Sequence, residues 1–408
     1  MINSLLTTLK KLWNNQQSQK DIKSFFEFGL GYAVTLIIGF LLVRQINLSL
    51  TQPEIGKYSF IASLTATICP VLYFSAPQAY LRFHSDHKIS KYLRKFVLPF
   101  FYFAAIVLAL ITWHYTQSWV AILYAAAPLF TEKTYLLRCQ MNITKLNILR
   151  IIELLLPLLL IFILKLWKQN ITANIVLGLY GIGYLTSLFF KASDLNEGSI
   201  EKKKIVKYLW PTIFTTCLSL FLTNSAVLFT KYFFGYEAAG LVGIANKTLI
   251  FINSLYTLFL MFFPMIYIRE AEKGNIKIIR QYRNFIMVIV TLACVIFTIF
   301  NKQIYWLIGA QKYCEHTGLF VGLLWVTYFN FIADIYWLYY SFELKTWKQS
   351  LLKLSAVLIL FSGIGFAPQF GPLYIVYLLL FAVVITSIFG AIFALYMERK
   401  RFNKDYVK

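Results

Sequence analysis

Long apolar segments follow one another along the chain and are separated by short polar connections. Several of them reach the ~20 residues that an α-helix needs to cross the hydrocarbon core of a bilayer. Charged residues make up 14% of the 408 residues, whereas an average soluble domain has about 25%. The sequence therefore predicts an all-α polytopic membrane protein.

The apolar segments predict twelve transmembrane helices. They cover residues 25–43, 58–81, 96–114, 118–137, 147–166, 172–192, 211–233, 240–266, 284–300, 317–342, 350–367 and 372–397. A long polar connection, residues 193–210, separates the first six from the last six. Because six is even, both halves enter the membrane in the same sense, which predicts two six-helix lobes related by a pseudo-two-fold axis along the membrane normal. We assign the N-lobe to 25–192 and the C-lobe to 211–397, with tails at 1–24 and 398–408.

Positive charge is distributed unevenly over this topology. Thirty of the 39 Lys and Arg residues lie in the two tails or in or beside the even-numbered connections between spans. Seven lie in or beside the odd-numbered connections. Lys and Arg are retained on the cytoplasmic side of a membrane, so both termini are predicted to be cytoplasmic. The net charge of +22 then reflects topology and attraction to anionic membrane lipids, and we expect no nucleic-acid partner.

No pattern in the chain indicates an enzyme. The five cysteines are scattered without CxxC spacing, which argues against a metal site or a disulfide framework. The chain has no HExxH motif and no glycine-rich nucleotide-binding loop. We therefore expect no catalytic residues, no metal and no cofactor.

A motif recurs in the two halves. Glu54 and Gly56 precede an apolar run that ends in the sequence PQAYLR at residues 77–82, and Glu237 and Gly240 precede one that ends in PMIYIR at residues 264–269. The Gly-to-Pro separations are 21 and 24 residues, and a basic segment follows each run. Pro, Tyr and Arg are also common at the ends of membrane helices, but their shared order favours an internal repeat.

Ionisable residues inside the spans are candidate functional groups, because each costs at least ~2.5–3.5 kcal/mol if it faces lipid. They are Glu132 and Lys133 in the fourth span, Glu153 in the fifth, Lys247 in the eighth and Asp334 in the tenth. Lys133 and Glu153 lie at similar depths on antiparallel neighbours and could form an ion pair, with either a structural or a substrate role.

The environments of the remaining charges are less clearly specified. Arg150, one turn from Glu153, could also pair with it. Lys247 and Asp334 have no obvious partner in their own helices, which favours a water-filled cavity, although Lys247 could also extend to the interface. Arg44 and Lys231 end equivalent spans and could ring an outer opening or serve as interfacial anchors.

Polar stripes at helical spacing accompany these charges. The eighth span carries Asn246, Asn253 and Thr257, with Lys247 and Ser254 alongside, and the seventh and tenth spans have similar stripes. Such residues often hydrogen-bond between helices. Three spans with such polar stripes in one half of the chain are also consistent with helix faces that line one water-filled cavity.

The chain resembles the polysaccharide (O-antigen-type) flippases of the multidrug/oligosaccharidyl-lipid/polysaccharide (MOP) exporter superfamily. The resemblance covers nearly the whole chain and is carried by residues 54–58, 78–82 and 237–247, Pro264, Gly274, Gly309 and Tyr313. It implies two lobes around a central cavity in a bacterial cytoplasmic (inner) membrane. It also implies a flippase that moves a polyprenyl-pyrophosphate-linked oligosaccharide, an O-antigen or capsule repeat unit, to the outer leaflet by alternating access.

Under this interpretation the deep charges form the substrate site. Lys247, Arg44, Lys231 and Lys133 are candidates to contact pyrophosphate or acidic sugars, and Asp334, Glu132 and Glu153 could couple transport to protons or sodium. A glycan polymerase is a candidate partner.

Three other functions remain open. A cation-coupled multidrug extruder of the same superfamily would favour Asp334 over the lysines. A non-transporting scaffold for glycan-synthesis enzymes would need none of the deep charges. A lipid II flippase of this superfamily usually has about fourteen spans, so twelve argue against it.

Overall fold

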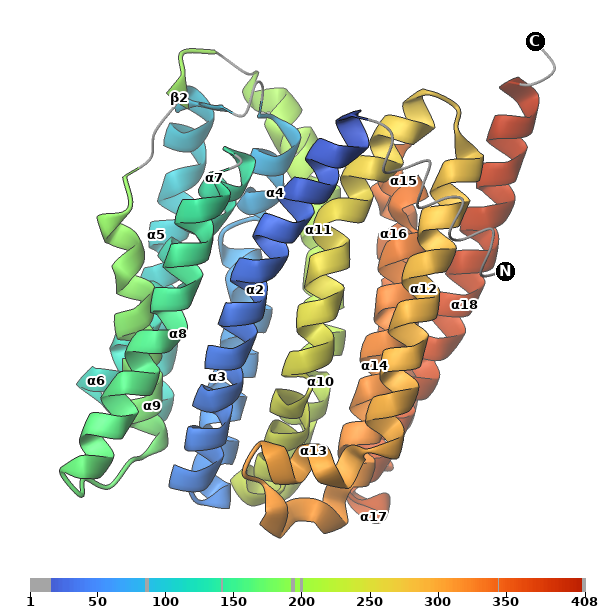
Figure 1. The fold of residues 1–408 in the computed structure, drawn as a ribbon. Helices are drawn as coiled ribbons and strands as arrows, with labels where there is room; N and C mark the ends of the chain where they lie inside the picture. The colour runs from blue at the N-terminus through green and yellow to red at the C-terminus, as the bar shows by residue number, and fades with distance from the viewer. Residues whose placement is uncertain are drawn as a thin grey trace.

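The computed structural model describes residues 16–84, 88–140, 142–191, 195–198, 201–343 and 345–405. Most of the predicted N-terminal tail and the last three residues lie outside this part of the chain. The described residues form an all-α bundle of long, roughly parallel helices (Figure 1). The predicted fold class is confirmed.

The described part of the N-lobe is built from eight α-helices and three short accessory elements. Its elements are α2 (Gln16–Ser49), α3 (Gln52–Leu72), α4 (Ala76–Arg82), β1 (Ile89–Ser90), α5 (Lys91–Thr116), α6 (Trp119–Ile122), η1 (Leu123–Ala126), α7 (Ala127–Cys139), α8 (Ile143–Leu166), α9 (Ala173–Leu185) and η2 (Thr186–Phe189).

The C-lobe follows a second short strand, β2 (Leu195–Asn196). Its elements are α10 (Lys202–Thr248), α11 (Ile250–Glu272), α12 (Ile276–Ile299), α13 (Asn301–Leu307), η3 (Gln311–His316), α14 (Thr317–Tyr336), α15 (Leu338–Phe342), α16 (Thr346–Ile364), α17 (Ala367–Phe370) and α18 (Pro372–Asp405).

Each of the twelve predicted spans falls on a helical segment, but the helices do not all break where the spans do. Nine helices in the described residues are long and apolar enough to cross a membrane, and two shorter apolar helices add to them. The 47-residue α10 contains the seventh span and the start of the eighth, which meet at Gly235 with φ 80°. A positive φ is easily adopted by glycine, so the chain reverses there without a separate loop.

Both ends of the described chain lie at the same end of the bundle, which we call the terminal end (Figure 1). The opposite end, called the distal end, contains α6, α13 and α17 (Figure 1). This arrangement is the one expected for an even number of crossings.

The helix α10 begins at Lys202, within the predicted inter-lobe linker 193–210. Ahead of it, β2 pairs in parallel with β1, with Ile89 opposite Leu195. On the first turns of α10, Ile205 and Leu209 are buried in an N-lobe cluster. The first turns of this C-lobe helix therefore pack on the N-lobe.

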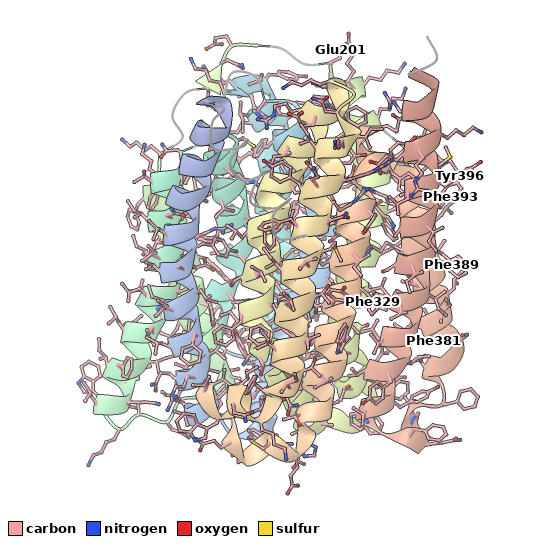
Figure 2. The ribbon with its side chains drawn as sticks, turned by 45° about the vertical axis from the view of Figure 1, so that its right-hand side comes forward. Glu201, Phe329, Phe381, Phe389, Phe393 and Tyr396 are labelled. Carbon is pink, nitrogen blue, oxygen red and sulfur yellow. The ribbon has the colours of Figure 1, made fainter. Side chains whose placement is uncertain are left out.

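Large apolar side chains cover the outside of the bundle. On α18, Phe381, Phe389, Phe393 and Tyr396 lie along one exposed face (Figure 2). Phe389 is 68% exposed. A soluble protein rarely exposes such a continuous apolar surface, whereas lipid tails accommodate it, so this face is the expected lipid-contacting surface.

An ion pair between the half-buried Arg94 and the buried Glu132 holds the terminal end of the N-lobe. The Tyr80 hydroxyl from the repeated motif donates to Glu132 Oε1 at 3.2 Å, and Arg94 Nε lies 2.9 Å from the same oxygen. Glu132 is 3% exposed. The contacts join the α4, α5 and α7 segments, which correspond to spans two, three and four.

The C-lobe has a matching arrangement. Arg283 Nη1 on α12 lies 3.0 Å from Glu398 Oε2 on α18, and both side chains are buried. Tyr267, the second tyrosine of the repeated motif, is fully buried and interacts electrostatically with both partners. The repeat therefore places a tyrosine beside an Arg–Glu pair in each lobe, and each pair stays within its lobe.

Removing one partner of the C-lobe pair should strongly destabilise the protein. Glu398→Ala leaves the Arg283 charge buried and unpaired, which costs about 3–5 kcal/mol. In detergent, the unfolding temperature should fall strongly for this variant and less for the double variant Arg283→Met/Glu398→Met. Glu201→Ala, which removes an exposed pair with Lys204, is the control and should change stability by less than about 1 kcal/mol.

Candidate substrate site between the lobes

Two glycines of the repeated motif meet at the distal end of the lobe interface. A methyl group at Gly56 of α3 would overlap the carbonyl oxygen of Tyr236 and would lie 2.9 Å from the Gly240 amide nitrogen. A methyl group at Gly240 of α10 would overlap the carbonyl oxygen of Gln52. The lobes thus touch backbone to backbone where both residues lack a side chain.

Polar side chains reinforce this contact, and together they form what we call the distal seal. Arg44 Nη1 donates to the carbonyl of Leu307 at 2.9 Å, and Asn47 Nδ2 donates to that of Ile308 at 3.0 Å. Both donors lie on α2, and the acceptors are the last residue of α13 and the residue after it, so these bonds join the two lobes. Gln52 Nε2 adds a third, to the Glu237 carbonyl at 2.9 Å.

Lys231 makes the reciprocal contact from the C-lobe. Its ammonium lies 4.9 Å from the centroid of the N-lobe Phe60 ring and 5.4 Å from that of Tyr236. Arg44 and Lys231 therefore lie in the closed distal seal and each reaches toward the opposite lobe. The sequence allowed two positions for them, at an outer opening or as interfacial anchors, and in the structure both contact the opposite lobe at the distal seal.

Gly56→Ala should hold the distal end open, because the added methyl group overlaps backbone that cannot rotate away. A single cysteine at Ser59, which is buried against Gly243, reports on this in a variant lacking the five native cysteines. We expect its labelling by a membrane-impermeant maleimide to rise several-fold in Gly56→Ala.

Gly365→Ala is the control for this experiment, since nothing lies within 4 Å of a methyl group there. It should leave the labelling low. Equal labelling in the two glycine variants would show that the glycine contact does not close the interface.

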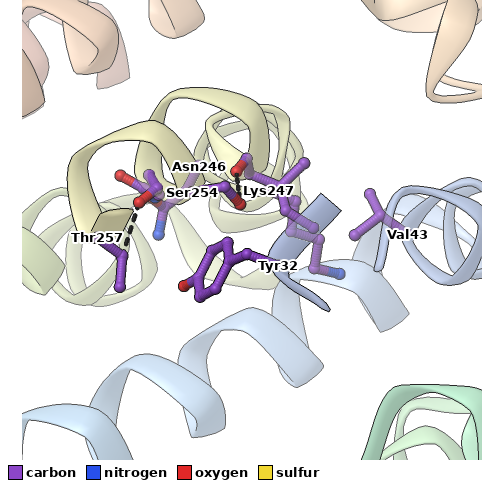
Figure 3. Close-up of a pocket in the computed structure, with 8 residues that line it drawn as sticks. Tyr32, Val43, Asn246, Lys247, Ser254 and Thr257 are labelled. Carbon is purple, nitrogen blue, oxygen red and sulfur yellow. Dashed lines mark hydrogen bonds between the residues drawn. The ribbon is translucent and has the colours of Figure 1, made fainter. Parts of the chain in front are cut away.

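A cavity of about 290 Å³ lies between the lobes. Tyr32 and Val43 of α2 line one side, and the polar stripe of the eighth span lines the other. The C-lobe lining residues are Asn246, Lys247, Ile250, Asn253, Ser254 and Thr257. The Lys247 side chain extends from α10 toward α2 and Val43 (Figure 3).

Lys247 is the unusual group of this cavity. Its Nζ atom is buried without a hydrogen-bond partner among the described residues. It lies 4.0 Å from the centroid of the Tyr58 ring on α3, close enough for a cation–π interaction. A ring face satisfies none of the three ammonium donors, so the group can still bind an anion.

A tyrosine cluster supports this cation from the N-lobe side. Tyr58 stacks on Tyr180 of α9 with ring centroids 5.8 Å apart, and Tyr184 lies 6.3 Å from Tyr180. The cluster is missing from the sequence-based prediction. Tyr58 and Tyr180 are far apart in sequence, and no spacing rule joins them.

Arg150 brings a second cation near the cavity. Its guanidinium carbon lies 5.3 Å from the ring centroid of Tyr32, a lining residue. On the same helix, Glu153 is half-buried and interacts electrostatically with Arg150. The expected pair between Lys133 and Glu153 is not formed, because Lys133 lies beside the Glu132–Arg94 pair. Glu132 and Lys133 thus lie inside the N-lobe and not at this cavity.

Asp334 lies apart from Lys247. It is an exposed residue of α14 and interacts electrostatically with Lys353 of α16. Lys353 Nζ in turn bonds to Asn330 Oδ1 at 3.0 Å. Asp334 therefore has a cationic neighbour on another helix. This partner could not be identified from the sequence of the tenth span alone.

Comparison with known proteins places the fold. No protein-family model matches the chain, and no curated protein is detected as a relative. A solved structure described as MATE in the straight conformation matches with a TM-score of 0.63 and 13% identity, over 97% of this chain and 98% of that one.

Two further matches are described as inward-facing and outward-facing conformations of a multidrug resistance MATE family transporter of the MOP superfamily. Each has a TM-score of 0.54; the identities are 14% and 13%, and the matches cover 93% and 98% of this chain and 96% and 92% of the others. The protein therefore has the all-α, two-lobed fold of the MATE transporters. The narrower resemblance to polysaccharide flippases is not confirmed by these matches.

Proposed function

We propose that the protein is a membrane transporter that works by alternating access of its two lobes. Three features support this: each lobe is held by its own ion pair, the lobes meet at a distal seal, and a cavity that includes Lys247 lies between the lobes. The two conformations described for proteins of this fold are those that such a mechanism requires.

The substrate that best fits the cavity is an anion attached to a lipid. The observation that carries this proposal is the Lys247 ammonium, which is buried between the lobes with only a ring face beside it. A polyprenyl-pyrophosphate-linked oligosaccharide, such as an O-antigen or capsule repeat unit, supplies the complementary charge. The cavity lies where α2 faces the α10–α11 segment, so the polyprenyl chain can remain in the bilayer.

The proposed orientation gives a direction to transport. With Lys and Arg retained on the cytoplasmic side, the terminal end is cytoplasmic and the distal seal faces outward across a bacterial inner membrane. A membrane potential that is negative inside then favours outward movement of an anion by ~2.3 kcal/mol per charge per 100 mV. We infer flipping from the inner to the outer leaflet.

Lys247→Ala should abolish or strongly reduce export of the surface glycan in a complementation assay. Loss of hydrogen bonds to a charged group costs about 1.5–3 kcal/mol, equivalent to a ~10- to 100-fold loss of affinity. Lys247→Arg, which retains the charge, should restore part of the activity.

Lys312→Ala is the matched control, since this lysine is exposed at the distal end beside Tyr313. Membrane insertion and unfolding temperature should be the same in all three variants. Normal export by Lys247→Ala would exclude Lys247 from the mechanism. A scaffold that does not transport would also tolerate this change.

A second candidate is cation-coupled multidrug extrusion. Two of the matched structures are described as a multidrug resistance transporter. In this chain, Asp334 is an exposed acidic residue on α14. A proton or sodium ion at Asp334 or Glu153 would supply the coupling.

Growth in the presence of cationic dyes separates the two candidates. If the protein extrudes drugs, its expression should raise dye tolerance, and Asp334→Asn should remove that gain while Lys247→Ala does not. If the protein is a flippase, dye tolerance should be unchanged by expression.

A further inference from the structure

A second and larger cavity, of about 500 Å³, lies between the N-lobe and the part of α10 that forms the seventh span. On the N-lobe side, α3, the turn into α4, η1, α7 and α9 contribute to it. On the other side, Thr215, Thr216, Ser219 and Leu220 of α10 contribute. We call it the α10 cavity. Its size is within the range of ordinary ligand sites.

The α10 cavity is lined by hydroxyl groups and aromatic rings together with apolar residues such as Ala66, Pro128 and Leu220. Hydroxyl-bearing residues come from both lobes, including Thr65, Ser75 and Thr131 opposite Thr216 and Ser219. Tyrosines, among them Tyr124 and Tyr184, add ring faces. None of its described lining residues carries a formal charge, in contrast to the cavity at Lys247.

This lining distinguishes between possible occupants. A bare anion or a cationic drug would need an opposite charge to offset its desolvation, and this lining supplies none. Sugar rings need hydroxyl partners that both donate and accept, together with flat faces against which their C–H groups can pack. The described lining meets the requirements of an uncharged polyol.

The α10 cavity also lies close to Lys247. Tyr184, which lines it, is 6.3 Å from Tyr180, Tyr180 is 5.8 Å from Tyr58, and the Tyr58 ring is 4.0 Å from Lys247 Nζ. Three neighbouring rings therefore span the distance between the two sites. In a lipid-linked glycan the sugars are bonded directly to the pyrophosphate, so adjacent sites could bind both parts at once.

We propose that the α10 cavity is a binding site for the uncharged sugars of the substrate, separate from the anion site at Lys247. This inference rests on the proposed flippase function. It restricts the substrate to head groups whose sugars next to the pyrophosphate are neutral hexoses or N-acetylhexosamines, and it disfavours uronic acids at this site.

The test measures binding of three defined lipids to the purified protein in nanodiscs. The probes are undecaprenyl pyrophosphate without sugar, the same lipid with an N-acetylglucosamine disaccharide, and the same lipid with a hexuronic acid disaccharide. The wild-type protein should bind the neutral glycolipid about fivefold or more tightly than the bare lipid, as one or more added hydrogen bonds would give. The acidic glycolipid should gain no such advantage.

The variant Thr216→Val/Ser219→Ala removes two hydroxyls of the α10 cavity. It should bind the neutral glycolipid no better than the bare lipid and leave binding of the bare lipid unchanged. The control Thr212→Val/Thr223→Val alters the same helical stripe at positions that do not line the cavity, and it should behave as wild type. Lys247→Ala should weaken binding of all three lipids.

The outcomes separate this assignment from the proposed function. The sugar site alone would be overturned if the wild type bound the bare and neutral lipids equally. It would also be overturned if Thr216→Val/Ser219→Ala and Thr212→Val/Thr223→Val behaved alike. Failure of all three pyrophosphate lipids to bind would overturn the flippase proposal and the sugar site with it.

Discussion

The hydrocarbon core of a membrane offers no water to a charged side chain, so each ionisable group must find its partner within the protein. In the N-lobe, Glu132 meets Arg94 and Tyr80, and in the C-lobe Glu398 meets Arg283. These contacts fasten helices to one another near the terminal end of each lobe. Lys247 is different, because its buried ammonium has a ring face and no hydrogen-bonding partner among the described residues.

The location of Lys247 connects the structure with the proposed transport. Buried pairs within a lobe make the lobe a unit, since breaking them is costly. Contacts between the lobes are of another kind: at the distal seal, side-chain amides and a guanidinium meet backbone carbonyls around two glycines. Neutral hydrogen bonds each contribute about 0.5–1.5 kcal/mol and those of a charged group such as the Arg44 guanidinium about 1.5–3 kcal/mol, so this interface can separate while the lobes stay intact.

Much of the fold could be predicted from the sequence, because membrane helices are encoded locally by apolar length. The twelve apolar segments and the repeated motif correspond to helices and to matching tyrosines in the two lobes. The stripe from Asn246 to Thr257 does line a cavity. Each of these patterns depends on residues close together in the chain.

The partners of the deep charges could not be predicted in this way. Arg94 pairs with Glu132, and Lys353 approaches Asp334, across helices whose rotation about their axes a single sequence does not specify. The same holds for Tyr58, which reaches Lys247 only because the two repeat glycines bring α3 and α10 into contact. Residues 202–210 of the predicted linker form the first turns of α10, and Ile205 and Leu209 among them are buried against the N-lobe.

The course of α10 has a consequence for any movement of the lobes. Its first turns, with Ile205 and Leu209, are anchored in the N-lobe, while Thr215 is bonded to Ser350 of the C-lobe at 2.6 Å. Pro211 lies between these anchors, and proline removes one rung of the helical hydrogen-bond ladder. A rocking motion must therefore flex this helix near Pro211, one turn from the residues that line the α10 cavity, so the same bend that reorients the lobes would reshape the chamber.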